Sequence, residues 1–289
     1  MTVVVVGDVA TDVVAVLDGA PAPGSDRPAT ISTRGGGAGA NVAVHLARLG
    51  TEVRMVGCVG NDPAGVGLVA ELAAAGVRPA LRTVPGTSTG TIVSLVEPDG
   101  QRSMLADRGA NLALEPGDVA LAHVRHLHLS GYTLLDPRPR AAGLAALAAA
   151  AAAGATISLD PASTAPLTAY GVDRWLADTA AATVVLPNAA EARLLTGCAD
   201  PADAARALAG RHRVAAVKLG ADGALWASGD VLVHRPALPT TVVDTTGAGD
   251  AFAAGLLAAW LAEPGIPPEW ALDAGLAHAA LVVARVGAR

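Results

Sequence analysis

The residues with the clearest potential for chemistry form the segment Asp244-Thr-Thr-Gly-Ala-Gly-Asp250. An apolar, helix-forming run follows at once, so Gly247, Ala248 and Gly249 are expected to turn their backbone N–H groups toward one point at a helix N-terminus. Unsatisfied amides and the helix dipole at such a terminus bind anions. Asp250 falls on the first turn of that helix, where its carboxylate is placed to take a proton from a hydroxyl. A general base beside an anion hole predicts a phosphoryl-transfer site.

A second glycine cluster, Gly35-Gly-Gly-Ala-Gly-Ala-Asn41, lies near the N-terminus. Its first, third and sixth residues also satisfy a dinucleotide fingerprint, and Asp62 lies at a suitable distance onward to contact a ribose. That fingerprint belongs in the turn after the first strand of a βαβ unit, whereas these glycines follow the polar segment 29–34. An NAD-dependent oxidoreductase therefore remains a remote alternative, and it leaves residues 244–250 unexplained.

Taken together, the two segments resemble the two signatures of the ribokinase family, the PfkB-type carbohydrate kinases, and the likeness runs in order along almost the whole chain. The resemblance implies an ATP-dependent kinase that phosphorylates a primary hydroxyl of a sugar. A nucleoside kinase of the adenosine or pseudouridine type is the alternative, and a non-catalytic sugar-binding protein is a more remote one. It also implies that Asp250 is the base and that the amides of residues 247–249 stabilise transition-state charge.

The resemblance assigns a substrate-binding end of the site as well. Asp12 is implied as a ligand of substrate hydroxyls, since a carboxylate accepts more than one hydroxyl proton; a solvent-facing loop acid is the plainer interpretation. Gly36 and Gly37 would let the backbone approach a sugar closely. Asn41, on the first turn of the next helix, would hydrogen-bond sugar hydroxyls through its amide.

Two departures from the ribose-specific members bear on the substrate. Those members carry an asparagine where this chain has Ala10, and a glutamate near residues 129–132, where this chain has no acid. Both absences weaken a ribose assignment and leave another pentose, a hexose or a nucleoside with an apolar base slot. The sequence therefore predicts only a primary hydroxymethyl group placed before Asp250.

A phosphate-binding loop of the P-loop type is excluded, because it needs a lysine after its glycines and the chain's only lysine is Lys218. The resemblance implies that ATP and Mg²⁺ are bound at other short segments. In Asn188-Ala-Ala-Glu191 both polar side chains share one helix face. The family's Asn-x-x-Glu motif positions the phosphates and Mg²⁺, with Glu191 acting through water. A simple helix N-cap by Asn188 is the plainer interpretation.

Further nucleotide contacts are implied near the C-terminus by resemblance alone. The residues that it places beside the phosphates and the adenine are Lys218, Gly220, Gly223 and His278. Asp244 is the candidate ligand of a monovalent cation such as K⁺. The chain stops at Arg289, where longer members continue and complete that cation loop, so activation by K⁺ is not a firm expectation.

Composition and charge narrow the class of protein. The 289 residues are 52% apolar and 2% aromatic, with a formal net charge of −6. No basic stripe is visible, so nucleic acid is not expected as a partner. Two cysteines form neither a disulfide framework nor a metal pattern, and a reduced, cytoplasmic setting is expected. The uncharged stretch 141–159 is mostly alanine with internal glycines, which favours a helix, a glycine cap and a strand over a membrane span.

The elements that must position these residues alternate between strands and helices. Apolar strands spaced by helices predict an α/β fold with a mainly parallel central sheet flanked by helices. Segments 12–34 and 86–107 do not follow this alternation. They are predicted to form short, partly polar strands, and two of these strands flank the turn Pro98-Asp-Gly100. They are either surface hairpins or, as the resemblance favours, a small β-lid over the substrate that would pair two chains into a homodimer. The main domain would then comprise residues 1–11, 35–85 and 108–289.

Overall fold

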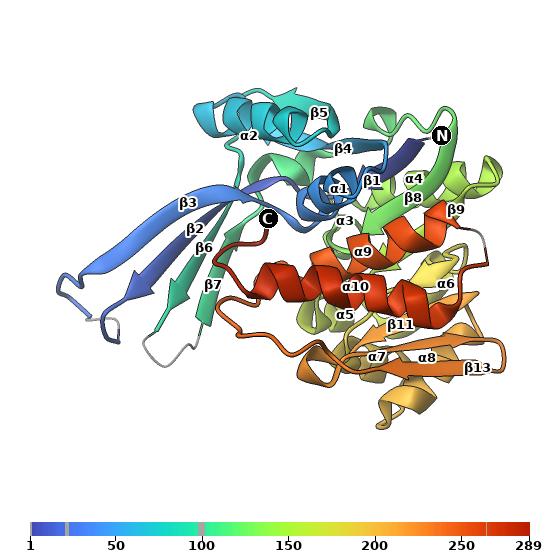
Figure 1. Ribbon diagram of the computed structural model, residues 1–289. Helices are drawn as coiled ribbons and strands as arrows, with labels where there is room; N and C mark the ends of the chain where they lie inside the picture. The colour runs from blue at the N-terminus through green and yellow to red at the C-terminus, as the bar shows by residue number, and fades with distance from the viewer. Residues whose placement is uncertain (1, 21–22, 98–101, 264) are drawn as a thin grey trace.

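The computed structural model describes residues 2–20, 23–97, 102–263 and 265–289, which form a large sheet covered by helices and a small sheet beside it (Figure 1). The turn predicted at Pro98–Gly100 lies outside these residues. The large sheet has nine strands in the order β13-β12-β11-β10-β9-β8-β1-β4-β5. In that order the strands are Val231–Arg235, Ala224–Ser228, Val214–Lys218, Val184–Val185, Thr156–Asp160, Val124–Ser130, Thr2–Val6, Val53–Gly60 and Arg78–Val84. All neighbours from β11 to β5 pair in parallel, and β12 and β13 pair antiparallel at one edge.

Helices cover both faces of this sheet, which confirms the predicted α/β fold. One face carries α1 (Ala38–Arg48), α2 (Pro63–Ala74), α9 (Ala248–Ala262) and α10 (Pro268–Val283). The other face carries α3 (Tyr132–Leu135), α4 (Arg140–Ala152), α5 (Thr164–Tyr170), α6 (Val172–Asp178), α7 (Ala189–Thr196) and α8 (Pro201–Ala209). The valines of β1 divide between the two cores: Val4 and Val6 pack on one side, Val3 and Val5 on the other. This alternation explains why a strand buried on both faces is an unbroken apolar run.

The predicted strands of the small sheet are also present. β2 (Ala10–Leu17), β3 (Ala29–Gly36), β6 (Gly90–Val96) and β7 (Arg102–Asp107) form a four-stranded sheet in the order β3-β2-β6-β7. It extends away from the large sheet, and the C-terminus lies near its base (Figure 1). Strand pairing places Asp12 opposite Ile92, and both side chains line a cavity between the small sheet and the large sheet. Val13, Val93 and Leu105 therefore lie on the opposite face.

The uncharged stretch 141–159 forms most of α4 and then enters β9, as predicted. Among the described helices, none combines the length and the apolar character needed to cross a bilayer. The carboxyl ends of the parallel strands meet at one edge of the sheet, where ligands bind in open α/β sheets. Ser130 ends β8, Asp160 ends β9 and Lys218 ends β11 at that edge.

Candidate active site

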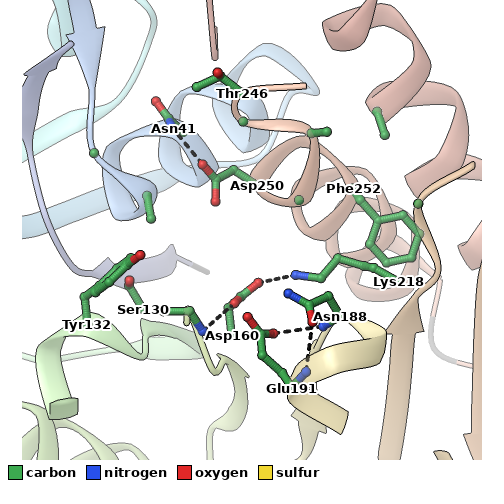
Figure 2. Close-up of a pocket in the computed structure, with 18 of the residues that line it drawn as sticks. Asn41, Ser130, Tyr132, Asp160, Asn188, Glu191, Lys218, Thr246, Asp250 and Phe252 are labelled. Atoms are coloured by element: carbon green, nitrogen blue, oxygen red, sulfur yellow. Dashed lines mark hydrogen bonds and ion pairs between the residues drawn. The ribbon is translucent and has the colours of Figure 1, made fainter. Parts of the chain in front are cut away.

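Residues predicted from five separate segments meet in one cavity of about 470 Å³. Of the predicted site residues, those that line it are Asp12, Gly37, Asn41, Asn188, Glu191, Lys218, Gly220, Gly223, Gly247, Ala248, Gly249 and Asp250. The cavity lies between the N-termini of α1 and α9 on one side and the ends of β8, β9 and β11 on the other (Figure 2). Asp250 faces Asp160, Ser130 and Tyr132 across the open space (Figure 2).

The predicted anion hole is built at the start of α9. Gly247 is the N-cap and has a left-handed φ of 75°, and no side chain caps the amides of the first turn. A Cβ at Gly247 would lie 2.5 Å from the Cβ of Ala288, so only glycine fits this turn. The Ala248 N–H donates to the Thr245 carbonyl at 3.2 Å, so this amide contributes less to the hole than predicted. The uncapped helix N-terminus retains the geometry of an anion site.

The carboxyl of Asp250 is held by a residue from the first signature. Its Oδ2 accepts a hydrogen bond from Asn41 Nδ2 at 2.8 Å (Figure 2). Burial raises the pKa of Asp250 to about 7, although the Asn41 hydrogen bond acts in the opposite direction. A carboxyl with a pKa near neutrality suits proton abstraction at physiological pH. Asn41 was predicted to bind sugar hydroxyls; one N–H of its amide donates to Asp250, and its other N–H and its Oδ1 remain for a substrate.

The pKa of Asp250 leads to a prediction about pH. With both substrates well below saturation, we expect the rate to fall as pH drops through about 7, because only ionised Asp250 accepts the proton. The fall should steepen below about 6, since burial raises the pKa of Asp12 to about 6. Asn41→Ala removes a bond that lowers the Asp250 pKa, so its acid limb should move to higher pH. A pH–rate profile tests this, with exposed Asp203→Asn as the control; an unmoved limb in Asn41→Ala would contradict it.

At the substrate end, two glycines make room for an acid and a tight turn. A Cβ at Gly36 would lie 2.2 Å from the Asp12 Cγ, so the absence of a side chain at Gly36 leaves room for the Asp12 carboxylate. Gly36 itself does not line the cavity. Gly37 has a φ of 92°, and a Cβ there would lie 2.5 Å from the Asp8 carbonyl oxygen. Asp12 Oδ1 is buried without a hydrogen-bond partner among the described residues. A buried acceptor of this kind is available for a substrate hydroxyl.

The phosphate end contains a charged pair that the sequence prediction missed in part. Lys218 Nζ donates to Asp160 Oδ2 at 2.5 Å (Figure 2). The ammonium also lies 3.4 Å from where a Cβ on Gly249 would stand, beside the anion hole. Burial disfavours the charged form of Lys218, but the carboxylates of Asp160 and Glu191 outweigh it and raise its pKa. Asp160 was not predicted, although it is the last residue of the buried strand β9 and lies at the edge of the sheet where the parallel strands have their carboxyl ends.

The segment from Asn188 to Glu191 both caps a helix and lines the cavity. Glu191 N–H donates to Asn188 Oδ1 at 2.9 Å, and Asn188 N–H donates to Glu191 Oε2 at 2.8 Å, which is a capping box at the start of α7. Both residues also line the cavity. Burial and the nearby Asp160 raise the pKa of Glu191. A cation that enters the cavity would relieve that repulsion between carboxylates.

Three predicted residues do not line the cavity. His278 Nε2 lies 3.1 Å from His45 Nδ1, and the α10 residues that line the cavity are Leu276 and Ala279. Both carboxylate oxygens of Asp244 accept backbone N–H groups, from Thr246 at 2.8 Å and from Gly287 at 2.9 Å. Gly36 is the third, for the reason given above. The structure therefore does not place His278 in the cavity, and the carboxylate of Asp244 holds the backbone of residues 246 and 287.

The dinucleotide alternative does not have the geometry it needs. Gly35 and Gly36 end β3 in the small sheet and do not follow β1 of the large sheet. Asp62 is the N-cap of α2, where its Oδ1 accepts from the Gly65 N–H at 2.8 Å and its Oδ2 from the Thr89 N–H at 2.7 Å. A carboxylate engaged in this way is not placed to bind a ribose, so that alternative is wrong.

Comparison with known proteins agrees with this geometry. The model of the family described as pfkB family carbohydrate kinase matches residues 1–289. The chain belongs to this family. Carbohydrate kinases of the pfkB family are phosphotransferases that act on sugar hydroxyl groups, and this enzyme is an ATP-dependent sugar kinase of that kind.

Individual relatives of this pfkB kinase differ in what they act on. The chain is 35% identical to the ATP-dependent ribose-1-phosphate kinase of Halopiger xanaduensis, over 92% of this chain and 87% of that protein. Its fold is similar to the crystal structure of adenosine kinase from Sinorhizobium meliloti, with a TM-score of 0.89, 27% identity and coverage of 99% and 95%. It is equally similar to an E. coli kinase solved with ATP and Mg²⁺, with a TM-score of 0.88, 26% identity and coverage of 99% and 94%.

Proposed function

We propose that this pfkB kinase transfers the γ-phosphoryl group of ATP to a primary hydroxyl of a sugar or a nucleoside, with Asp250 as general base. The observation that carries the proposal is the placement of a partly buried carboxyl, with a pKa of about 7, on the first turn of the helix that forms the anion hole. Asn41 orients that carboxyl, and Asp12 supplies an unpartnered acceptor for the substrate in the same cavity.

In this reaction the substrate hydroxyl loses its proton to Asp250 as its oxygen attacks the γ-phosphorus. The backbone amides at the start of α9 face the oxygens of the transferred group, and their dipoles stabilise the charge that spreads over these oxygens. The Lys218 ammonium lies beside the same amides and supplies the positive charge of a side chain. Asp250 in this position acts as an acceptor of one proton per turnover.

Mg²⁺–ATP fits the donors on the other side of the cavity. Asp160 and Glu191 supply carboxylate oxygens, the type of ligand that Mg²⁺ prefers, and their mutual repulsion favours a bound cation. When bound, Mg²⁺ neutralises charge on the phosphates. Asn188 and Glu191 would position it, with Glu191 acting through water, and the turn from Gly220 to Gly223 would bring the backbone against the nucleotide.

The proposed function is tested by release of ADP from Mg²⁺–ATP with a panel of acceptors. The panel should contain pentoses, hexoses, ribose 1-phosphate and ribonucleosides, because the relatives include kinases for ribose 1-phosphate and adenosine. We expect one acceptor class to raise ADP release well above the hydrolysis rate without acceptor. Release that no member of the panel raises would contradict the proposal.

The carboxylate of Asp244 attracts a monovalent cation less than the resemblance implies, because the amides of Thr246 and Gly287 each donate to one of its oxygens and offset part of its charge. We therefore expect the rate to be nearly equal in potassium chloride and in choline chloride of the same concentration. Initial rates at saturating substrates measure this, with ionic strength held constant as the control. Activation by K⁺ of about fivefold or more would contradict it.

We also infer that segments 12–34 and 86–107 act as a lid and as a dimer interface. The face of the small sheet opposite the cavity carries several apolar side chains, and Ile31 and Leu105 on it are 66% and 61% exposed. A second copy of the sheet would cover this face.

Mass measurement in solution tests the interface. We expect the parent protein to be a dimer and Leu105→Asp to dissociate, with a dissociation constant raised about tenfold to a hundredfold by burial of an unpaired charge. Leu281→Asp, on α10 and also 66% exposed, is the control and should stay dimeric. A monomeric parent protein, or a dimer that Leu105→Asp leaves intact, would argue against the interface.

A further inference from the structure

The acceptor end of the cavity, from Asp250 to Ser130 and Tyr132, contains polar atoms that lack partners. Within the described residues, Asp12 Oδ1, Asn41 Oδ1 and Ser130 Oγ are buried without a hydrogen bond, and Ser130 is only 2% exposed. Two of these atoms can only accept, and the serine hydroxyl both donates and accepts. Buried polar groups are normally satisfied, so a ligand with hydroxyl groups is expected to satisfy them. Neighbouring hydroxyls of a sugar ring match this set.

The wall beside these atoms is apolar. Ile92 and Met104 of the small sheet line the cavity. Tyr132 lines it from the start of α3 (Figure 2). Met104 is 58% exposed and lines the cavity, so its thioether side chain is accessible to a ligand there. A free sugar would turn hydroxyls toward this wall and lose their hydrogen bonds. A flat heterocycle gains contact with an aliphatic, a thioether and an aromatic side chain instead.

The charges at this end disfavour a phosphorylated acceptor. Lys218, at the phosphate end, pairs with Asp160. Arg108 approaches Tyr132, with its guanidinium carbon 5.9 Å from the ring centre, but both carboxylate oxygens of Asp8 accept its hydrogen bonds at 2.9 and 2.7 Å. The Arg289 guanidinium acts against the burial that raises the pKa of Asp12, but it pairs with Glu71 at 3.1 Å, is only 3% exposed and does not line the cavity. A phosphate on the acceptor would therefore meet Asp12 with no unpaired cation among the described residues that line the cavity.

From these three features we infer that the acceptor is an uncharged ribonucleoside. Its ribose hydroxyls bond to Asp12, Asn41 and Ser130, and its base lies against Tyr132 and the small sheet. The inference rests on the proposed kinase function. The nucleoside O5′ forms a bond to the γ-phosphorus, the bond from that phosphorus to the β–γ bridging oxygen breaks, and the O5′ proton passes to Asp250. The products are a nucleoside 5′-monophosphate and ADP.

The first test compares four ribonucleosides (adenosine, inosine, cytidine and uridine) with ribose, fructose and ribose 1-phosphate in the ADP-release assay. We expect kcat/KM for at least one nucleoside to exceed that for every sugar and for ribose 1-phosphate by about a hundredfold. A higher kcat/KM for a free sugar or for ribose 1-phosphate would overturn this inference and leave the proposed kinase function intact. Failure of all seven acceptors would overturn both.

The second test replaces Met104 in this apolar wall. Because the Met104 side chain is 58% exposed, its replacement should not unfold the protein, and a thermal melt checks this. Met104→Arg should raise KM for the nucleoside by about tenfold or more and improve kcat/KM for ribose 1-phosphate, because it removes apolar contact and adds the missing cation. Val66→Arg, which adds the same charge at a 70% exposed position of α2 that does not line the cavity, is the control and should keep the parent KM. KM for Mg²⁺–ATP should stay constant in both. A nucleoside KM that Met104→Arg leaves unchanged would overturn the contact with the base.

Discussion

Replacement of Asp250 by Asn is expected to lower kcat by about two to four orders of magnitude, because an amide cannot accept the proton of the attacking hydroxyl. The Asn41 amide can still donate to the new side-chain oxygen, as it does to Asp250 at 2.8 Å, so the geometry of the first turn of α9 should persist. Mg²⁺–ATP affinity should change little, since the proposed nucleotide contacts are the backbone amides, Lys218 and the Asn188–Glu191 segment, and not the Asp250 side chain. Single-turnover kinetics and nucleotide titration measure the two quantities separately.

Stability supplies an internal control for this variant. Burial raises the pKa of Asp250 to about 7, so the folded protein holds the ionised form at a cost relative to the unfolded chain. A raised carboxyl pKa means that ionisation opposes folding above the unfolded pKa, and Asp250→Asn removes this opposition. The variant should therefore be as stable as the parent at pH 8 or more so. Parent-like turnover, or a large loss of stability at pH 8, would contradict the assignment as base.

The sequence was sufficient for the parts of the site that local chemistry fixes. Gly247, with a φ of 75°, and Gly37, with a φ of 92°, occupy backbone conformations that favour glycine, so their spacing already marked two functional turns. Asn188 and Glu191 are three residues apart, and their shared helix face follows from that spacing. The α/β fold was predictable for a similar reason, since strands buried on both faces are continuous apolar runs.

Partnerships between distant segments were not predictable in the same way. The hydrogen bond from Asn41 to Asp250 joins residues 209 positions apart, and the pair Lys218–Asp160 joins residues 58 apart. No local pattern encodes which polar groups face each other across a cavity, because strand order decides it. The sequence accordingly predicted Asn41 as a sugar ligand but did not predict its hydrogen bond to Asp250.

The position of His278 outside the cavity follows from its place around the helix α10. Leu276 and Ala279 are three residues apart on the face of α10 that lines the cavity, and His278 lies off that face, against His45. Leu276 and Ala279 give this face of α10 an apolar character. The family resemblance was enough to predict that residues around 278 lie near the site. It could not predict which face of α10 turns toward the cavity, because the packing of α10 against α9 determines that.

Replacement of Lys218 by Met is expected to lower kcat/KM by about two to three orders of magnitude, because it removes the only lysine charge beside the anion hole. The same change leaves Asp160 largely buried and unpaired, since the two side chains are only 16% and 18% exposed. Loss of one partner of a buried pair costs about 3–5 kcal/mol of unfolding free energy, so the single variant confounds catalysis with stability.

A double variant separates the two effects. Lys218→Met with Asp160→Asn removes both charges, which should restore most of the unfolding free energy lost in the single variant, because no unpaired buried charge remains. Activity should stay low, since neither stability nor packing replaces a cation that meets the transferred phosphoryl group. Denaturant unfolding and steady-state kinetics on the parent, both single variants and the double variant form a complete cycle. If the double variant regained parent-like kcat/KM, Lys218 would serve only to neutralise Asp160, and the phosphoryl group would have to be stabilised by the backbone amides and Mg²⁺ alone.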